Sequence, residues 1–565
     1  MSGVIFVTPN WDGYVREEPV GTLLLATILR SNGIQAQIVQ FYNFGDVHDF
    51  PRFLERAVQE IAERHPKIVS FYTRCDSYHI CLKIAQLVKA ALPDTYIVFG
   101  GPQSDLSAVE TLQQIPYVDY ICCGEGETTV TPFFSSLLLG KPDHSIEGLV
   151  YRQDGQIVVN PRPALIPDLD ALPPVDYSLL DFRSEAHAMK VKQLFPVDVG
   201  RGCPFSCTFC STKSFWGRKY RLKSAERIVE EIKHIHDVFG LSDFVFEHDM
   251  FTMNRAKVIR VCQMLKQIGF PITWRCSARV DCLDEELIDI MADAGMESLF
   301  VGIETGSPRM QKLVQKNLKL DRVYDLLKYT ADKGVTTTAS FIYGFPQETE
   351  EDFAQTVLLM ARLARLPKVI LLPNLCAFFP GTELTRQYIG QITRASVFSG
   401  ATGDVAVREC EDLISAHPVL FPHFFEFHSQ LREKIRYFPQ FMNCWKLLWP
   451  VYEYLYEQYY SDNVCRMLYD FTQHNLPLLE ADASSLKLVQ EGRFFDLFAD
   501  DPQYRTIREI VRFVAWRAEA QDRSTEVFRF DVQAFLSGKA LTEYVPASVA
   551  VTRLGAGKLR LFKLP

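Results

Sequence analysis

Apolar runs of strand length alternate with segments of helical period in two parts of this 565-residue chain, residues 1–140 and about 190–375. A helical pattern follows each run, and the first five runs lie at 4–7, 34–41, 68–71, 96–99 and 118–121. Repeated β/α units of this kind form parallel sheets with helices on both faces. Residues 1–140 are therefore predicted to form an open, doubly wound, Rossmann-like sheet.

The same alternation returns after residue 190. Six further apolar runs lie at 197–201, 243–248, 273–280, 297–304, 336–343 and 368–374. The helical patterns between them lie at 224–238, 254–267, 284–294, 321–333 and 349–365. Six β/α units predict a second parallel domain, and its chemistry is expected at the carboxyl ends of the strands.

A segment without this alternation separates the two domains. Residues 150–159 predict a hairpin that turns at Asp154-Gly155. Prolines then recur at positions 161, 163, 167, 173 and 174, which predicts a semi-rigid connector. We expect this segment to set how the two domains face each other.

The chain becomes helical and aromatic after residue 385. An aromatic stripe at helical spacing more often fills a core than binds a cofactor, and this one comprises Trp445, Trp449, Tyr452, Tyr456 and Tyr459. The last residues, about fifty in number, alternate as short strands. The predicted domains are 1–140, 141–190, 191–385 and 386–565, the last a mainly helical accessory domain.

Composition excludes several classes of protein. The net charge is -9 with both signs interspersed, which argues against a nucleic-acid partner. No stretch offers eighteen uninterrupted apolar residues, and the N-terminus lacks the basic region of a signal peptide. Of the fourteen cysteines, all but three are scattered through apolar segments, which suits a reducing compartment. We therefore predict a cytoplasmic protein with no membrane partner.

Three cysteines are closely spaced: Cys203, Cys207 and Cys210, in the stretch RGCPFSCTFC. Three thiolates can hold three irons of a 4Fe-4S cluster and leave the fourth iron open to a small molecule. A structural zinc site usually needs two separated pairs of ligands, and no second pair lies nearby, so zinc is the less favoured alternative. The distant cysteines after residue 385 do not predict a second cluster.

This stretch resembles the cluster loop of the radical S-adenosylmethionine (SAM) enzymes, whose open iron chelates the methionine part of SAM. The resemblance implies a partial (β/α)6 barrel with SAM contacts at its strand ends. It implies that Phe209 packs near the adenine, that Glu247 or Asp249 accepts from the amine, that Ser277 and Arg279 hold the carboxylate, and that Glu304 binds the ribose. For Glu247, Ser277 and Arg279 a solvated loop residue or helix cap is the ordinary alternative.

The run Ser340–Gln347 resembles the adenine-binding segment of that family and contributes Gly344. Ser340 stands where the family has its usual first glycine, and Gln347 where it has its last glutamate. His248 is predicted to be a structural group rather than a metal ligand.

Upstream, the segments VFGGPQSD and YICCGEGE look like the cobalamin-binding domain of the cobalamin-dependent radical SAM enzymes. Glycine pairs at strand ends let the backbone approach a bulky ligand. The implied cobalamin contacts are Tyr72, Thr73, Arg74, Gly100, Gly101, Gly124, Glu125 and Glu127. On composition alone, a flavodoxin-like or response-regulator-like module is the alternative.

The resemblance implies a methyltransferase that methylates an unactivated carbon of a small-molecule or peptide substrate, through methylcobalamin and a 5'-deoxyadenosyl radical. An electron donor such as flavodoxin or ferredoxin is the implied partner. The alternatives are a cyclase or rearrangement oxidoreductase with the same cofactors and a non-catalytic corrinoid or iron-sulfur sensor. The substrate is expected to contact the C-terminal region.

A histidine on cobalt is not expected. The loop after the first strand, Asn10-Trp11-Asp12-Gly13, contains no histidine, and His48 is interpreted as a surface residue. The lower face of cobalamin should then lie against Tyr72, Thr73 or Arg74. We predict that electron paramagnetic resonance (EPR) of the Co(II) form shows no nitrogen superhyperfine coupling. A coupling that disappears in the His48→Ala variant would contradict this prediction.

Overall fold

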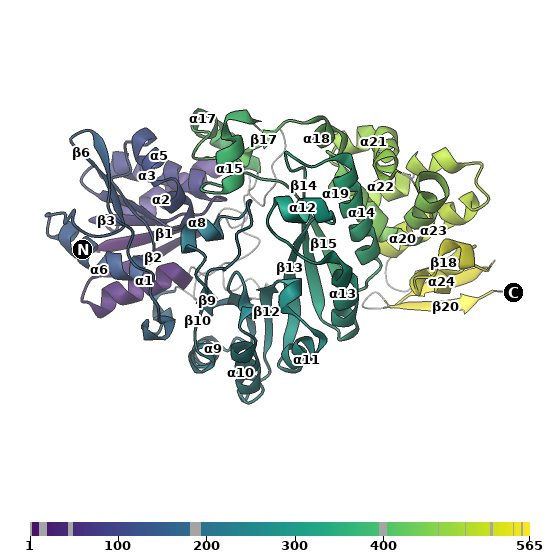
Figure 1. Ribbon diagram of the computed structural model, residues 1–565, viewed down its shortest axis with the longest axis horizontal. Coiled ribbons are helices and arrows are strands. Elements are labelled where there is room, and N and C mark those ends of the chain that lie inside the picture. Colours follow the sequence, from purple (N-terminus) through teal and green to yellow (C-terminus); the bar gives the residue numbers. More distant parts are fainter. Residues whose placement is uncertain are drawn as a thin grey trace. The chain divides into compact units, whose positions relative to one another are not determined.

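The computed structural model describes residues 3–10, 20–42, 49–180, 194–394, 404–461, 463–491, 493–519, 524–545, 547–554 and 558–564 (Figure 1). Trp11 to Gly13 and His48, on which the prediction about cobalt depends, lie outside these residues. The chain divides into two compact units. The first comprises Met1–Val301, Val314–Lys316 and Cys376–Phe427, and the second comprises Gly302–Leu313, Asn317–Leu375 and His428–Pro565.

The N-terminal sheet has the predicted doubly wound form. Its parallel strands lie in the order β2-β1-β3-β4-β5, with β1 Val4–Asn10, β2 Ala36–Tyr42, β3 Ile68–Tyr72, β4 Tyr96–Gly100 and β5 Tyr120–Cys122. The order reverses at β1 and β3, and ligands of such sheets bind beyond the carboxyl ends near that point. The prediction of a Rossmann-like sheet is confirmed.

Helices cover both faces of this sheet. Helices α1 (Val20–Ser31) and α6 (Gly126–Leu138) pack on one face, with Phe6, Leu29 and Phe133 in the shared core. Helices α2 (Phe50–Ala62), α3 (Tyr78–Ala91) and α5 (Ala108–Gln114) pack on the other, and α4 (Pro102–Leu106) follows β4 directly.

The predicted hairpin extends the same sheet. Strands β6 (Leu149–Gln153) and β7 (Gln156–Val159) are antiparallel, and β6 pairs with β5. Asp154 and Gly155 at the turn have φ values of 51° and 77°, which a two-residue hairpin requires. Between residues 160 and 180, all of which the structure describes, the connector forms only two 3-10 turns, Leu169–Ala171 and Tyr177–Leu179.

The six predicted strands of the second domain form one sheet, in the order β15-β14-β13-β12-β11-β8. They are β8 Phe195–Asp198, β11 Asp243–Glu247, β12 Thr273–Ala278, β13 Met296–Glu304, β14 Thr336–Tyr343 and β15 Val369–Leu375. The pairs β8–β11, β11–β12, β12–β13 and β14–β15 are parallel. The boundary between the two units falls within β13, so each half is described separately.

The helices of this domain lie close to their predicted limits. They are α9 Ala225–Phe239, α10 Arg255–Leu265, α11 Glu285–Asp293, α13 Val323–Asp332 and α14 Glu350–Ala364. The structure adds a short α12 (Pro308–Leu313) after β13.

The cysteine-rich loop lies between two short strands of the first unit. Strands β9 (Gly200–Arg201) and β10 (Arg221–Leu222) are antiparallel, and α8 (Thr212–Trp216) lies between them in sequence. We call residues 200–222 the cluster hairpin. Gly202 has a φ of 84°, and a Cβ there would lie 2.0 Å from the Lys219 carbonyl oxygen, so the turn needs glycine.

Residues 376–427 return to the first unit after β15. They form α15 (Glu383–Tyr388), β16 (Ile392–Arg394), α16 (Asp404–Glu409), α17 (Glu411–Ala416) and β17 (Phe425–Phe427). Val407, Ile414, Phe421 and Phe424 from this segment join the core that contains α2 and α3.

The C-terminal part of the second unit is mainly helical, as predicted. Its helices are α18 Gln430–Lys434, α19 Phe438–Leu447, α20 Trp449–Leu455, α21 Val464–Glu480, α22 Ser485–Glu491, α23 Tyr504–Glu519 and α24 Val532–Leu536. Strands β18 (Thr525–Phe528), β19 (Val549–Arg553) and β20 (Leu559–Lys563) form an antiparallel sheet.

Part of the aromatic stripe is core. Trp445 and Tyr452 are buried, which confirms the prediction for them, whereas Tyr459 is 40% exposed and donates to Asp501. Among the described helices, none is long and apolar enough to span a bilayer.

Candidate functional site

The thiols of Cys203, Cys207 and Cys210 lie together in the cluster hairpin, half-buried and free of disulfides. Burial raises the pKa of Cys203 to about 11, and the nearby charges of Cys210, Asp249 and Cys207 add to this effect. The loop is held by the backbone of two other segments of this unit, because Thr208 donates to the Val314 carbonyl at 3.1 Å and accepts from Leu384 at 3.0 Å.

This arrangement fits a cluster better than a single ion. Within the described part of the chain, no three His, Cys, Asp or Glu side chains can hold one metal ion together. Cluster ligation does not require such convergence, since each cysteine bonds a different iron. The three thiols can therefore occupy three corners of a 4Fe-4S cluster.

Two predicted contacts of the SAM amine follow β11. Glu247 ends the strand, and both Glu247 and Asp249 are exposed. Asp249 accepts a hydrogen bond from the Thr212 hydroxyl at 3.2 Å. Desolvation of its carboxyl group by neighbouring protein atoms raises the pKa of Asp249, although the hydrogen bond from Thr212 and another from the Gly202 backbone partly offset this effect. Asp249 thus lies beside the cluster hairpin. Its contact with SAM, like that of half-buried Phe209, stays a prediction.

His248 forms hydrogen bonds with two backbone groups. Its Nδ1 accepts the Met250 N–H at 2.7 Å, so Nε2 carries the proton and donates to the Arg221 carbonyl at 3.2 Å. Burial lowers its pKa to about 4 and keeps the ring neutral. The His248 ring packs closely against the backbone of the cluster hairpin, because a Cβ added at Gly200 would lie only 2.5 Å from the ring.

Arg279 contacts the cluster loop from the barrel side. Its guanidinium lies 3.7 Å from the centre of the Phe205 ring and is almost fully buried. Nε and Nη2 donate to Asp281 at 2.9 and 2.8 Å, and Nη2 also donates to the Lys316 carbonyl at 2.8 Å. A SAM carboxylate could then meet only Nη1. The predicted contacts of Arg279 and of half-buried Ser277 are not tested by this geometry.

Two predicted contacts belong to the second unit. Glu304 ends β13, is buried, and has a φ of 69°, which is rare for a residue with a side chain. Gly344 has a φ of 76°, donates its N–H to Glu348 and accepts from Arg432 Nε at 2.7 Å. Left-handed backbone in a residue with a side chain is common at functional sites, which supports the prediction for Glu304. The contact of Gly344 stays a prediction, since glycine adopts this conformation readily.

Glu348, one position beyond the run Ser340–Gln347, is a candidate site residue that the sequence interpretation did not include. Its side chain is buried, and burial raises its pKa to about 8 although the N–H groups of Gly344 and Phe345 favour the charged form. Gln347, which was compared with the family's last glutamate, instead presents its carbonyl to Arg309 Nη2 at 2.6 Å. The available signal was an acidic residue one position further along.

Thr73, a predicted cobalamin contact, joins the ends of β3 and β4. It is completely buried, and its hydroxyl lies 2.9 Å from the Gly100 carbonyl and 2.8 Å from the Ser104 hydroxyl. Gly101 has a φ of 95°, and a Cβ there would lie within 2.9 Å of the Thr73 backbone. In contrast, a Cβ on Gly100 would meet its nearest atom only at 3.8 Å. Gly101 is therefore required by the close approach of the Thr73 backbone, whereas a Cβ at Gly100 would make an ordinary van der Waals contact.

The other predicted cobalamin contacts differ in their partners. Tyr72 is half-buried, and Arg74 pairs with Asp76 at 2.9 Å. Gly124 donates its N–H to Asp105 at 2.6 Å. Glu125 and Glu127 pair with arginines of the cluster hairpin, at 2.6 Å in each case from Arg201. Direct contact of these residues with a corrinoid stays a prediction.

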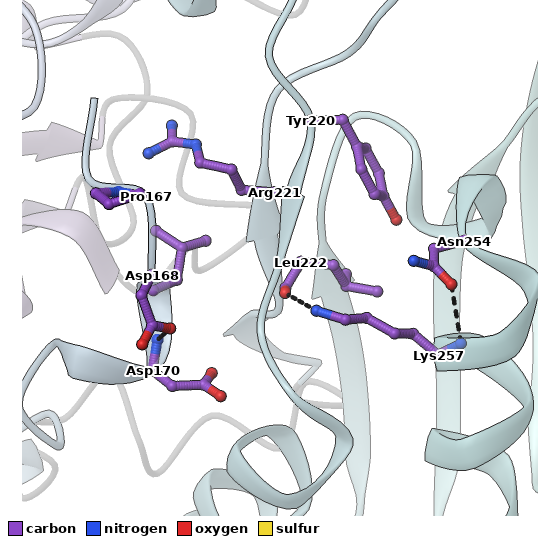
Figure 2. A pocket seen from close by; sticks show the side chains of 9 residues that line it. Pro167, Asp168, Asp170, Tyr220, Arg221, Leu222, Asn254 and Lys257 are labelled. Atoms are coloured by element: carbon purple, nitrogen blue, oxygen red, sulfur yellow. Dashed lines mark hydrogen bonds between the residues drawn. The ribbon is translucent and has the colours of Figure 1, made fainter. Parts of the chain in front are cut away.

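A pocket of about 390 Å³ lies beside the cluster hairpin (Figure 2). Figure 2 shows Arg221 and Leu222 of β10 between the connector and the side chains of Asn254 and Lys257, and Lys257 donates to the Leu222 carbonyl at 2.6 Å. Its lining consists of Pro167, Asp168, Leu169, Asp170, Tyr220, Arg221, Leu222, Asn254 and Lys257. No predicted SAM or cobalamin contact lines it, so it is separate from the predicted cofactor contacts.

Comparisons with known proteins identify both domains. Residues 197–360 match the model of the radical SAM superfamily, and residues 14–133 match the model of the B12 binding domain. An uncharacterized methyltransferase of Pyrococcus horikoshii is 30% identical over 301 residues, which cover 53% of this chain and 64% of that protein. An anaerobic magnesium-protoporphyrin IX monomethyl ester cyclase of Rubrivivax gelatinosus is 26% identical over 364 residues, with 62% and 64% coverage.

A solved structure shares the fold. It is that of the cobalamin-dependent S-adenosylmethionine radical enzyme OxsB with aqua-cobalamin and S-adenosylmethionine bound, with a TM-score of 0.60 at 13% identity. The match covers 91% of this chain and 79% of that one. The two sequence relatives are matched over just under two thirds of their own length.

The cluster hairpin on a radical SAM sheet defines a radical SAM enzyme, with a 4Fe-4S cluster and SAM as cofactors. With its B12 binding domain and cobalamin as a third cofactor, the chain belongs to the cobalamin-dependent radical SAM enzymes.

We predict that anaerobically reconstituted protein holds one 4Fe-4S cluster and loses it when Cys203, Cys207 or Cys210 is changed to alanine, because three thiolates are the minimum set. Iron and sulfide analysis and EPR of the reduced protein measure this. Cys465→Ala, at a half-buried thiol in α21, is the control and should keep the cluster. About eight irons per chain, or a cluster in the triple variant, would contradict the assignment.

A second prediction concerns Glu348. Between its ordinary pKa of 4.5 and the folded value of about 8, the folded protein keeps a proton that the unfolded chain has released. The free energy of unfolding therefore falls as pH rises through this range. Glu348→Gln keeps a neutral acceptor for Gly344, so its Tm minus the wild-type Tm should increase from pH 5 to pH 8.

Glu350→Gln is the matched control for this measurement. Its carboxylate is half exposed and pairs with Lys434, so the Tm difference should be flat over the same pH range. An equally flat difference for Glu348→Gln would show that its carboxyl is ionised in the folded protein.

Proposed function

We propose that this protein is a methyltransferase that transfers a methyl group from a corrinoid to an unactivated carbon of a small-molecule or peptide substrate. When bound, the cluster and SAM supply a 5'-deoxyadenosyl radical, and cobalamin supplies the methyl group. The observation that carries the proposal is the direct attachment of the cluster hairpin to the B12 binding domain, by buried ion pairs within one compact unit.

The chain's own residues would position these groups and exclude water. Cys203, Cys207 and Cys210 would hold three irons, and the Arg279–Phe205 contact would keep their loop in place. Asp249 presents a carboxylate beside that loop, which suits an ammonium group. A methyl transfer from cobalt to carbon then requires that the two cofactor domains keep a fixed orientation.

Relatives support methyl transfer but also favour one rival. The Pyrococcus relative carries the name methyltransferase, whereas the Rubrivivax relative is named a cyclase. A cyclisation or rearrangement with the same cofactors is therefore the second candidate. The two differ in whether a methyl group from SAM enters the product. A sensor without catalytic activity would not cleave SAM under strong reductant.

The partners follow from the chemistry. Reductive cleavage of SAM requires one electron, which we propose comes from a small donor protein such as flavodoxin or ferredoxin. The substrate is proposed to contact the mainly helical C-terminal region, since the residues there have no other assigned role.

The test separates the two uses of SAM. We predict that Cys207→Ala forms no 5'-deoxyadenosine, because radical formation requires the cluster. Protein without cobalamin should cleave SAM abortively and form no methylated product. The measurement is quantitation of 5'-deoxyadenosine, S-adenosylhomocysteine and product mass with methyl-labelled SAM.

Two outcomes would contradict the proposal, and each excludes a different part of it. A methylated product from corrinoid-free protein would exclude transfer through cobalt. A product that is dehydrogenated or cyclised and carries no label would favour the rival reaction.

A further inference from the structure

A buried group of ion pairs joins the B12 binding domain to the cluster hairpin. Arg201 Nη1 donates to Glu125 at 2.6 Å, and Nη2 donates to Glu127 at 2.6 Å. Arg221 lies opposite Arg201 in the antiparallel pair of β9 and β10. Its Nη1 donates to both carboxylate oxygens of Glu125, at 3.0 and 2.8 Å. We call these four side chains the interdomain ion group.

All four side chains are withdrawn from solvent. Glu125 is 1% exposed, Glu127 8%, and Arg201 and Arg221 10% each. The Trp216 ring lies 5.9 Å from the Arg201 guanidinium and 5.4 Å from that of Arg221. Charges at such sites are stable only when they are paired and hydrogen-bonded, and the loss of one partner leaves a costly unpaired charge.

The carboxylate of Glu125 stays ionised in this setting. Burial alone raises its pKa, but the hydrogen bonds from Arg221, Arg201 and the Ile166 N–H outweigh burial and lower it below the usual value. Burial alone would lower the pKa of Arg201. The charges of Glu127 and Asp198 outweigh burial, so the pKa of Arg201 lies above its ordinary value. Both directions favour the charged forms of Glu125 and Arg201.

The connector takes part as well. The Ile166 N–H donates to Glu125 Oε2 at 2.6 Å, and the Ile166 carbonyl accepts from Arg221 Nη1 at 2.6 Å. Three segments thus meet at Glu125: the loop after β5, the connector and the cluster hairpin. Because charged hydrogen bonds are directional and Arg201 uses two nitrogens on two carboxylates, this contact fixes orientation as well as distance.

Arg201 lies two residues before Cys203, and the backbone at Gly202 between them packs directly against the Lys219 carbonyl. A displacement of Arg201 is therefore transmitted to the first cysteine. Buried ion pairs contribute little net stability compared with apolar residues of equal volume. What they can supply here is a defined orientation of the cluster hairpin relative to the loop after β5.

We propose that Glu125 and Arg201 are positioning residues that set the orientation of the cluster loop relative to the B12 binding domain. Through this orientation, a substrate carbon activated on the cluster side lies within reach of the corrinoid. The inference rests on the proposed function, but it concerns the coupling of two reaction steps and not their identity. In this role Glu125 acts through Arg201 and Arg221.

The first test is coupling between the two steps. In Glu125→Gln, SAM cleavage should continue, whereas fewer radicals should end in product. The ratio of 5'-deoxyadenosine to methylated product should rise about tenfold or more, since misplacement of reacting groups by about 1 Å can cost about a hundredfold in rate. Glu297→Gln is the control, because the Arg275–Glu297 pair lies between β12 and β13 and is about one third exposed.

The second test does not depend on activity. Pulsed EPR measures the distance distribution between Co(II) cobalamin and the reduced cluster in the same protein. The distribution should be narrow in the wild type and in Glu297→Gln and clearly broader in Glu125→Gln. A parallel fall of cleavage and product formation with an unchanged distribution would overturn the proposal.

Arg201→Lys decides the case if Glu125→Gln does not bind its cofactors. Lysine keeps the charge but cannot bond both carboxylates with the fixed geometry of a guanidinium. A wild-type ratio and a wild-type distance distribution in Arg201→Lys would overturn the inference. If the wild type makes a cyclised product instead, the ratio is measured against that product, so failure of the methyltransferase proposal is recognised separately.

Discussion

The contact between Arg201 and its two carboxylates determines how the first unit is organised. Removing four charged side chains from water is unfavourable, and only mutual pairing with good geometry offsets it. The pairing can form in one arrangement of the three segments, because the guanidinium is planar and its donors point in fixed directions. The loop after β5, the connector and the cluster hairpin are therefore brought into one orientation.

A second set of contacts holds the cluster loop from the barrel side. Arg279 packs on Phe205 and is itself held by Asp281 and the Lys316 carbonyl. His248 holds the base of the cluster hairpin through the Arg221 carbonyl. The three cysteines thus lie between contacts from the β5 end and from the ends of β11 and β12.

Local patterns predicted the strands and helices well, because apolar periodicity is a property of neighbouring residues. The hydrogen-bond partners of charged residues, in contrast, often lie far apart in the sequence and are not specified by local patterns. Glu125 was assigned to the corrinoid from its place at a strand end, yet its hydrogen-bond partner Arg201 lies 76 positions away. Nothing in the local pattern of either segment specifies that pairing. Arg279 shows the opposite case, since its partner Asp281 is only two residues away and visible in the sequence.

The first sheet also depends on a part of the chain that its own β/α rhythm does not reveal. Val407, Ile414, Phe421 and Phe424 pack into the core formed by α2 and α3, more than 300 residues after those helices. Gln103 and Gln114 bond Leu420 and His417 of the same segment. Without residues 404–427 this apolar face would be exposed to water, which is unfavourable in proportion to its area. The apolar core on this face of the B12 binding domain is therefore completed by residues that follow the barrel strands in the sequence.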